Sequence, residues 1–127
     1  MKMKDERRSI RYPLGMKCVF RLHDVAMEPV AATMRDVSRQ GCCLETGADV
    51  GRPEEAVEIH FETPTGPRAG MIVGAVVQRQ HTPGGWSLGI AFTNPDPAVK
   101  FELLDAAYQR WQAGLAAPPG VDAPPEA

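Results

Sequence analysis

The sequence predicts a mainly β fold, with about six antiparallel strands in a barrel or sandwich and one α-helix near the C-terminus. Apolar residues alternate with polar ones in several short segments, which is the period of a strand with one buried face. Twelve glycines and twelve prolines among 127 residues favour many short turns. A chain of this length forms one domain on ordinary size grounds.

The expected strands cover residues 15–22, 29–35, 42–46, 56–62, 70–80 and 86–93. In the first of them, Met16, Cys18, Phe20 and Leu22 recur at every second position. Turn residues separate the strands, most clearly the Pro-Thr-Gly-Pro run at 64–67 and the Pro-Gly-Gly run at 83–85. The short connections favour antiparallel neighbours.

The last predicted element is a helix that begins at Asn94-Pro95 or Asp96-Pro97, because a capping residue followed by proline is a helix start signal. Its apolar residues recur at spacings of three and four and form one helical face: Phe101, Leu104, Tyr108, Trp111 and Leu115. We expect this face to pack on the barrel or cover an open end; the alternative is a partner helix in a dimer.

Charge and the distribution of large hydrophobic residues divide the chain into three parts. The net charge is −2, yet residues 1–11 hold five basic and two acidic side chains. Residues 116–127 have Val121 as their one large hydrophobic residue. We therefore expect a flexible basic arm at 1–12, a barrel plus helix at 13–115 and a disordered Pro/Ala-rich tail at 116–127. The acidic body argues against nucleic acid as a partner.

Cysteine usage and hydropathy suggest a soluble cytoplasmic protein. Cys18, Cys42 and Cys43 occur without a CxxC spacing, so we expect free thiols in a reducing compartment and no metal site. The sequence contains no apolar run of 18 residues, so we expect no membrane insertion.

Enzyme motifs are missing from the sequence. It contains no nucleophile elbow, zinc-protease, Walker or dinucleotide-binding motif. We expect His23, His60 and His81 to be solvated surface residues rather than catalytic bases. The sequence thus favours a binding protein with no catalytic residues and no cofactor.

Arginines crowd the end of the basic arm, at Arg7, Arg8 and Arg11. A guanidinium group is a planar fork that binds phosphate oxygens in a bidentate manner and matches the O6/N7 edge of guanine. A charge run alone is usually a solvated one, so these residues acquire significance only beside a second motif.

The second motif is the turn Asp36-x-Ser38-x-x-Gly41. An Asp carboxylate can accept hydrogen bonds from guanine N1 and N2, and a Ser hydroxyl can bind phosphate. A glycine permits close approach of the backbone. The arm and the turn together offer groups for every edge of a guanine nucleotide.

In these two motifs the chain resembles the PilZ domain family. Residues 7–11 match its RxxxR motif and residues 36–41 match its (D/N)xSxxG motif. The later strands, 74–77 and 86–92, are also similar to the family, so the resemblance covers residues 6–112. It implies a six-stranded antiparallel PilZ-type β-barrel with a C-terminal helix.

The resemblance also implies a function: binding of the bacterial second messenger cyclic di-GMP, as one molecule or a stacked pair. The residues it implicates are the motif arginines Arg7 and Arg11, the interior Arg8, and Asp36, Ser38, Gly41 and Trp86. Trp86 lies where some relatives have an aromatic residue near the ligand, although a role in the core or rim explains it equally well.

We therefore expect a stand-alone receptor in which cyclic di-GMP rearranges the arginine arm and so changes the surface offered to a protein partner. Two alternatives remain. One is a PilZ-like adaptor that acts only through protein contacts, which the intact motifs disfavour. The other is a small barrel that binds single-stranded nucleic acid, which the acidic body disfavours.

Overall fold

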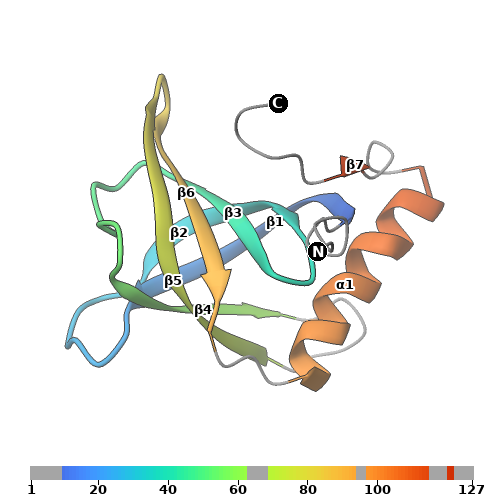
Figure 1. The fold of residues 1–127 in the computed structure, drawn as a ribbon, viewed down its shortest axis with the longest axis horizontal. Coiled ribbons are helices and arrows are strands. Elements are labelled where there is room, and N and C mark those ends of the chain that lie inside the picture. The colour runs from blue at the N-terminus through green and yellow to red at the C-terminus, as the bar shows by residue number, and fades with distance from the viewer. Residues whose placement is uncertain (1–9, 63–68, 94–96, 115–119, 122–127) are drawn as a thin grey trace, which may run out of the picture.

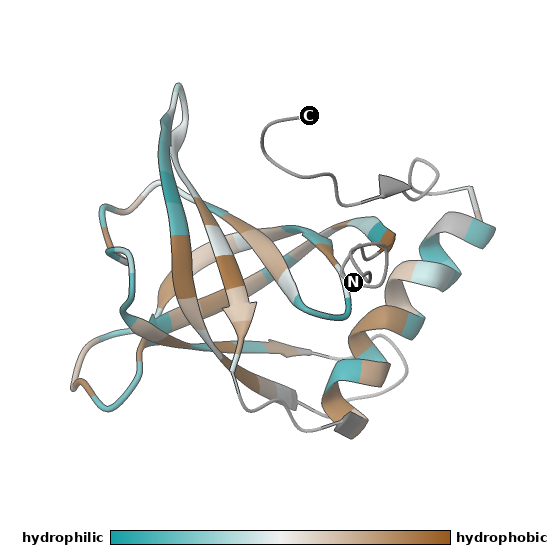
Figure 2. Ribbon diagram, viewed as in Figure 1, coloured by the Kyte–Doolittle hydropathy of each residue, from teal (hydrophilic) through white to brown (hydrophobic). Residues whose placement is uncertain are grey.

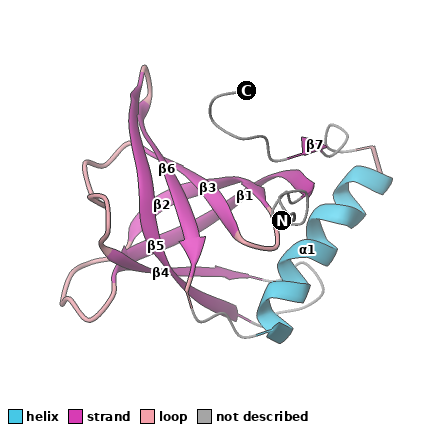
Figure 3. Ribbon diagram, in the orientation of Figure 1, coloured by secondary structure: helices cyan, strands magenta, loops and turns pink. Residues whose placement is uncertain are grey.

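Strands β1–β6 and the helix α1 form the fold of the computed structural model, which describes residues 10–62, 69–93, 97–114 and 120–121 (Figures 1 and 3). All six predicted strands are confirmed, and so is the helix. Their bounds are β1 Ile10–Leu22, β2 Val30–Val37, β3 Gly41–Thr46, β4 Ala56–Glu62, β5 Ala69–Thr82, β6 Gly85–Phe92, α1 Pro97–Gln112 and the short β7 Gly120–Val121.

The strands form one antiparallel sheet that closes on itself. The order is β2-β3-β6-β5-β4-β1-β7, and β1 also pairs with β2. Residues 12–20 of β1 pair with β2, whereas residues 19–22 pair with β4. This closure gives the barrel-like arrangement that the sequence predicts, with the core on the inner face of the strands.

The core combines the apolar residues that alternate along the strands with Leu103 and Ala107 of α1. The largest of its fully buried side chains are Phe20, Met34, Leu44, Ile59, Ile72, Leu88 and Leu103. Figure 2 shows the same alternation as hydrophobic and hydrophilic bands along the strands. Period-two patterning therefore determines which face of each strand is inside.

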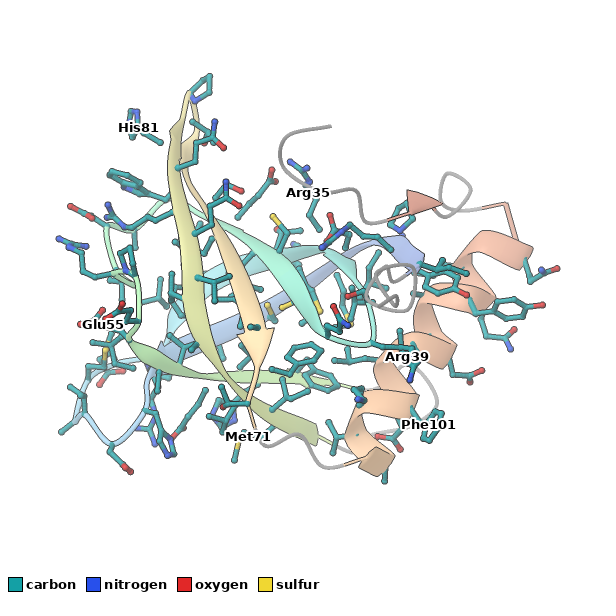
Figure 4. All side chains as sticks on the ribbon, viewed as in Figure 1. Arg35, Arg39, Glu55, Met71, His81 and Phe101 are labelled. Atoms are coloured by element: carbon teal, nitrogen blue, oxygen red, sulfur yellow. The ribbon has the colours of Figure 1, made fainter. Side chains whose placement is uncertain are left out.

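The helix packs through a face that overlaps the predicted one only in part. Leu103, Ala106 and Ala107 are buried, whereas Phe101 is 71% exposed and Tyr108 is 43% exposed. Figure 4 shows Phe101 pointing away from the strands. The small alanines let α1 lie close to β1, β2 and β5. The prediction that Phe101 and Tyr108 pack on the barrel is therefore wrong, whereas Leu104 of the same predicted face is half-buried and packs against the core. The Trp111 side chain and Leu115 lie outside the described residues.

The boundaries of the arm and tail also differ from the predicted ones. Residues 10–12 belong to β1, where Tyr12 pairs with Val37 of β2. In the tail, Gly120 and Val121 form β7 and pair with Arg11 and Ile10. Backbone pairing thus places residues 10–12 and 120–121 in the sheet, although the arm and tail sequences contain few large apolar residues. The rest of the arm and tail lies outside the described residues.

On the outer face of β1 and β4, Glu58 gathers three basic side chains. Arg21 Nε donates to Glu58 Oε1 at 3.0 Å, and His60 Nε2 lies 3.2 Å from the same oxygen. His23 Nδ1 lies 2.7 Å from Glu58 Oε2. Hydrogen bonds from His23, Arg21 and His60 lower the pKa of Glu58 from 4.5 to about 2. Two of the predicted surface histidines thus bond to one carboxylate, which is itself 7% exposed.

We predict that Glu58→Gln lowers the free energy of unfolding at pH 7. Because the folded-state pKa is depressed, the contribution of Glu58 to stability is present above about pH 4.5 and is lost as the pH falls towards 2. The difference between wild type and variant should therefore shrink across this window. Denaturant unfolding at a series of pH values measures it.

Glu28→Gln is the matched control, because Glu28 is an exposed carboxylate in the β1–β2 connection. This variant should follow the wild-type curve at every pH. A difference between wild type and Glu58→Gln that stays constant from pH 7 to pH 2 would contradict the assigned role of the carboxylate.

Candidate functional site

A cavity of about 330 Å³ lies on the outer face of the sheet. Cys43, Ser87 and Gly89 line it, and they alternate along β3 and β6 with the buried Leu44 and Leu88. The full lining consists of Arg11, Arg35, Asp36, Cys42, Cys43, Val77, Gln78, Gln80, Ser87, Gly89 and Ile90. Its volume is at the lower end of the range for small-molecule sites, and its walls are largely polar.

The two sequence motifs meet at this cavity through one ion pair. Arg11 Nη1 lies 2.5 Å from Asp36 Oδ1, with the side chains 33% and 14% exposed. The register of β1 and β2 shifts between Pro13 and Met16, where Gly15 has a left-handed backbone (φ 66°). This irregularity lets β1 extend to the N-terminal side of Pro13, so that Arg11 reaches the Asp36 carboxylate of β2.

A second irregularity places two successive residues of β2 on the same wall. The register of β2 against β3 shifts between Met34 and Asp36, so Arg35 is the extra residue. Met34 and Val37 are buried, whereas Arg35 and Asp36 both line the cavity. A further shift in β5, at Val77, precedes the two glutamines that line the opposite side, Gln78 and Gln80.

The remaining motif residues, Ser38 and Gly41, shape the turn between β2 and β3. The Ser38 N–H donates to the Gly41 carbonyl oxygen at 2.8 Å, and Ser38 Oγ accepts from the Gln40 N–H at 3.2 Å. Ser38 is 1% exposed. A side chain at Gly41 would overlap the carbonyl oxygen of Ile90 in β6. The close approach that requires glycine here is therefore between two strands.

Trp86 lies apart from the cavity. It lines a separate hollow of about 400 Å³ beside the β5–β6 turn, together with Glu45, Thr46 and Gly47. The Arg79 guanidinium stacks 3.6 Å from the centroid of its ring, and His81 meets it edge-on at 4.8 Å. The structure thus brings Arg11 and Asp36 together at the cavity, next to the Ser38–Gly41 turn, but not Trp86. Arg7 and Arg8 lie outside the described residues.

Sequence reasoning did not identify Arg35, Gln78, Gln80, Cys43 or Ser87 as part of the site, although all of them line the cavity. Outward positions on neighbouring strands of the predicted sheet would have indicated Cys43 and Ser87, which face each other at 3.3 Å. No pattern in the sequence indicates the bulges that turn Arg35 and Gln78 towards the cavity.

The thiols differ in their surroundings. Burial raises the pKa of Cys18 to about 11 and that of Cys42 well above its ordinary value. Cys43 is only partly buried, and desolvation raises its pKa as well. Within the described residues, no group of His, Cys, Asp and Glu side chains is arranged to hold a metal ion. None of the helical segments described has the length and apolar character needed to span a bilayer.

Taken together, these observations define a small closed-sheet domain with a polar cavity on its outer face, lined by arginine and carboxylate groups. The model of the PilZ domain matches residues 5–109, and the chain belongs to the PilZ domain family. The family resemblance predicted from the two motifs is therefore confirmed. Comparison with curated protein sequences gives no match.

Several solved structures share this fold. The Bacillus subtilis inhibitor of motility (MotI/DgrA) has a TM-score of 0.64 at 9% identity over 89% of this chain. This chain covers 53% of that protein, about half its length. The PilZ domain of CeSA from a cellulose-synthesizing bacterium gives 0.59 at 12% identity, covering 78% of this chain and 95% of that one. The PilZ domain of Escherichia coli YcgR, solved with c-di-GMP, gives 0.59 at 13%, covering 85% and 97%.

We predict that Gly41→Ala destabilises the fold, because the added methyl group overlaps the Ile90 carbonyl oxygen. Overpacking of this kind typically costs about 1–3 kcal/mol. Thermal unfolding should show a lower Tm. Gly84→Ala is the control, since nothing lies within 4 Å of the position of its added carbon. Equal Tm values for the two variants would contradict the strand-packing role of Gly41.

Proposed function

We propose that this chain is a receptor for cyclic di-GMP that changes conformation on binding and signals through a protein partner. The observation that supports it best is the Arg11–Asp36 ion pair, which joins the two ligand-binding motifs at one cavity. The solved PilZ domain of YcgR contains c-di-GMP, which supports the same ligand class.

Each polar group has a proposed role. Arg11, together with Arg7 and Arg8, would bind phosphate oxygens or the O6/N7 edge of guanine. Asp36 uses Oδ1 for Arg11, and a carboxylate has further acceptor positions for guanine N1–H and N2–H. The same ion pair makes Asp36 a positioning residue for Arg11, so it would act on the ligand both directly and through the arginine.

Ser38, Gly41 and Trp86 have more indirect roles in this proposal. Ser38 and Gly41 would support the site by fixing the turn that follows Asp36, since the serine hydroxyl is used within the turn. Trp86 would contact only a ligand that extends into the neighbouring hollow.

The conformational change involves the chain before β1. Arg11 and Tyr12 already lie in β1 of the free chain, so the rearrangement would concern the residues that precede Ile10. Phosphate binding by Arg7 and Arg8 would draw that segment over the cavity. The altered surface would then change affinity for a protein partner in the cytoplasm.

We predict that cyclic di-GMP binds and that cyclic di-AMP binds much more weakly. Adenine offers no counterpart to guanine N1–H and N2–H, so the acceptor positions of Asp36 that Arg11 does not use would be desolvated without a hydrogen bond, at about 1–3 kcal/mol. Calorimetric titration with both nucleotides gives affinity and stoichiometry. Arg11→Ala should weaken cyclic di-GMP binding about tenfold or more.

Lys17→Ala is the control for Arg11→Ala, because it removes the same charge from an exposed position of the same strand. Its affinity for cyclic di-GMP should match that of wild type. If titration with cyclic di-GMP produces neither heat nor a change in the absorption or fluorescence spectrum of the protein, the adaptor alternative is favoured over a nucleotide receptor. Equal affinities for both nucleotides would show that the chain does not distinguish the bases.

We also predict that cyclic di-GMP slows alkylation of Cys43. Cys43 lines the cavity and is partly exposed, whereas Cys18 and Cys42 are buried. Iodoacetamide at mildly alkaline pH should therefore label Cys43 first, and saturating ligand should reduce that rate. Peptide mass spectrometry measures each cysteine separately. An unchanged Cys43 rate in protein that calorimetry shows to be saturated would place the ligand elsewhere.

A further inference from the structure

Arg35 belongs to neither sequence motif, yet it lines the same cavity as Arg11 and Asp36. The reason is the bulge in β2. Met34 and Val37 face the core, and Arg35 is the extra residue against β3. Arg35 and Asp36 therefore both face outward, although they are consecutive in the strand. Figure 4 shows Arg35 on the outer side of the strands. The cavity therefore has a second arginine whose position depends on backbone geometry and not on motif spacing.

In the free chain, this arginine is bonded to a carboxylate beyond the cavity. Arg35 Nη1 donates to Glu45 Oε2 at 2.8 Å, and the two side chains are 58% and 43% exposed. Glu45 itself lines the neighbouring hollow and not the cavity. Ion pairs this exposed contribute little to stability, because water solvates the separated charges well. Replacing the Glu45 carboxylate by another anion as the partner of Arg35 therefore costs little free energy.

The charges of the cavity favour such an exchange. Its described charged residues are Arg11, Arg35 and Asp36, and Arg11 is bonded to Asp36. Arg35, by contrast, bonds to Glu45, which does not line the cavity. A phosphodiester group offers oxygens that match the guanidinium fork, as a carboxylate does.

We propose that Arg35 is a further ligand-binding residue and that Glu45 competes with the ligand for it. On binding, the guanidinium group leaves Glu45 and donates to a phosphodiester oxygen of the nucleotide. This inference rests on the proposed function, because it concerns the same ligand and the same cavity. Glu45 then lowers the affinity of the free receptor and so adjusts the concentration at which it responds.

The test is a mutant cycle, measured by calorimetric titration of the full chain with cyclic di-GMP at fixed salt. We expect Arg35→Ala to weaken binding about threefold to tenfold, since one charge-assisted contact replaces another. We expect Glu45→Gln to strengthen binding about twofold to fivefold by removing the competing charge. In the double variant the Glu45→Gln gain should disappear, because the arginine it releases is absent.

Arg52→Ala is the matched control. Arg52 is an arginine of similar exposure, 54%, whose Nη1 bonds to Asp49 Oδ1 at 3.0 Å, and it does not line the cavity. Arg52→Ala removes the same charge as Arg35→Ala, so a general electrostatic effect would weaken cyclic di-GMP binding equally in these two variants. Arg35→Lys keeps the charge and loses the fork, and its affinity should fall between Arg35→Ala and wild type. Thermal unfolding verifies that each variant is folded.

The outcomes separate the two proposals. If wild type binds and Arg11→Ala weakens binding, but Arg35→Ala matches Arg52→Ala, the role of Arg35 is refuted and the receptor function stands. If Glu45→Gln weakens binding, Glu45 orients Arg35 and the competition is refuted. If wild type does not bind cyclic di-GMP, the proposed function fails first and the role of Arg35 fails with it.

Discussion

The structure depends on one strand, β1, pairing with two neighbours. Its 13 residues are enough to pair with β4 at one end and with β2 along most of its length. This double pairing closes the sheet, so that strands β1–β6 each have a partner on both sides. Closure removes exposed strand edges and gives the apolar alternation a single interior. The outer face is then available for polar groups.

The outer face becomes a site because the strands are irregular at specific positions. Register shifts occur at Pro13–Met16 in β1, at Arg35 in β2 and at Val77 in β5. Each shift changes which side chains point outward, and residues on all three strands line the cavity. Regular strands would have placed Arg35 and Asp36 on opposite faces. The set of polar groups that line the cavity thus depends on departures from ideal strand geometry.

The sequence predicts the strands well because burial on one face imposes a period of two, and Phe20, Ile59 and Leu88 follow it. It predicts the buried face of α1 only in part, because large side chains dominate any hydrophobicity pattern, whereas Ala106 and Ala107 are buried through their small size. The cluster around Glu58 combines residues from β1, β4 and the turn after β1. Such a combination depends on strand register, which the sequence does not reveal.

The candidate site shows the same limits. Arg11 and Asp36 meet as the two motifs suggest. The start of β1, which carries Arg11, pairs with the end of β2, which carries Asp36. Trp86 does not join them, because its position on β6 places it with Arg79 and His81 beside the β5–β6 turn. Ser38 is a polar residue whose hydroxyl is used by the local backbone. Residue type predicts what a side chain can bind, but only the fold determines what it does bind.

The early start of β1 has a consequence for the entropy of ligand binding. Fixing the backbone of a flexible residue costs about 1–2 kcal/mol, which any ligand that orders it must offset. Arg11 is held by the β1–β7 ladder, by Tyr12 pairing with Val37 and by its bond to Asp36. That ordering cost belongs to folding and not to association. The anionic ligand proposed for the cavity would meet a preorganised guanidinium group, so more of the contact energy would be retained as affinity.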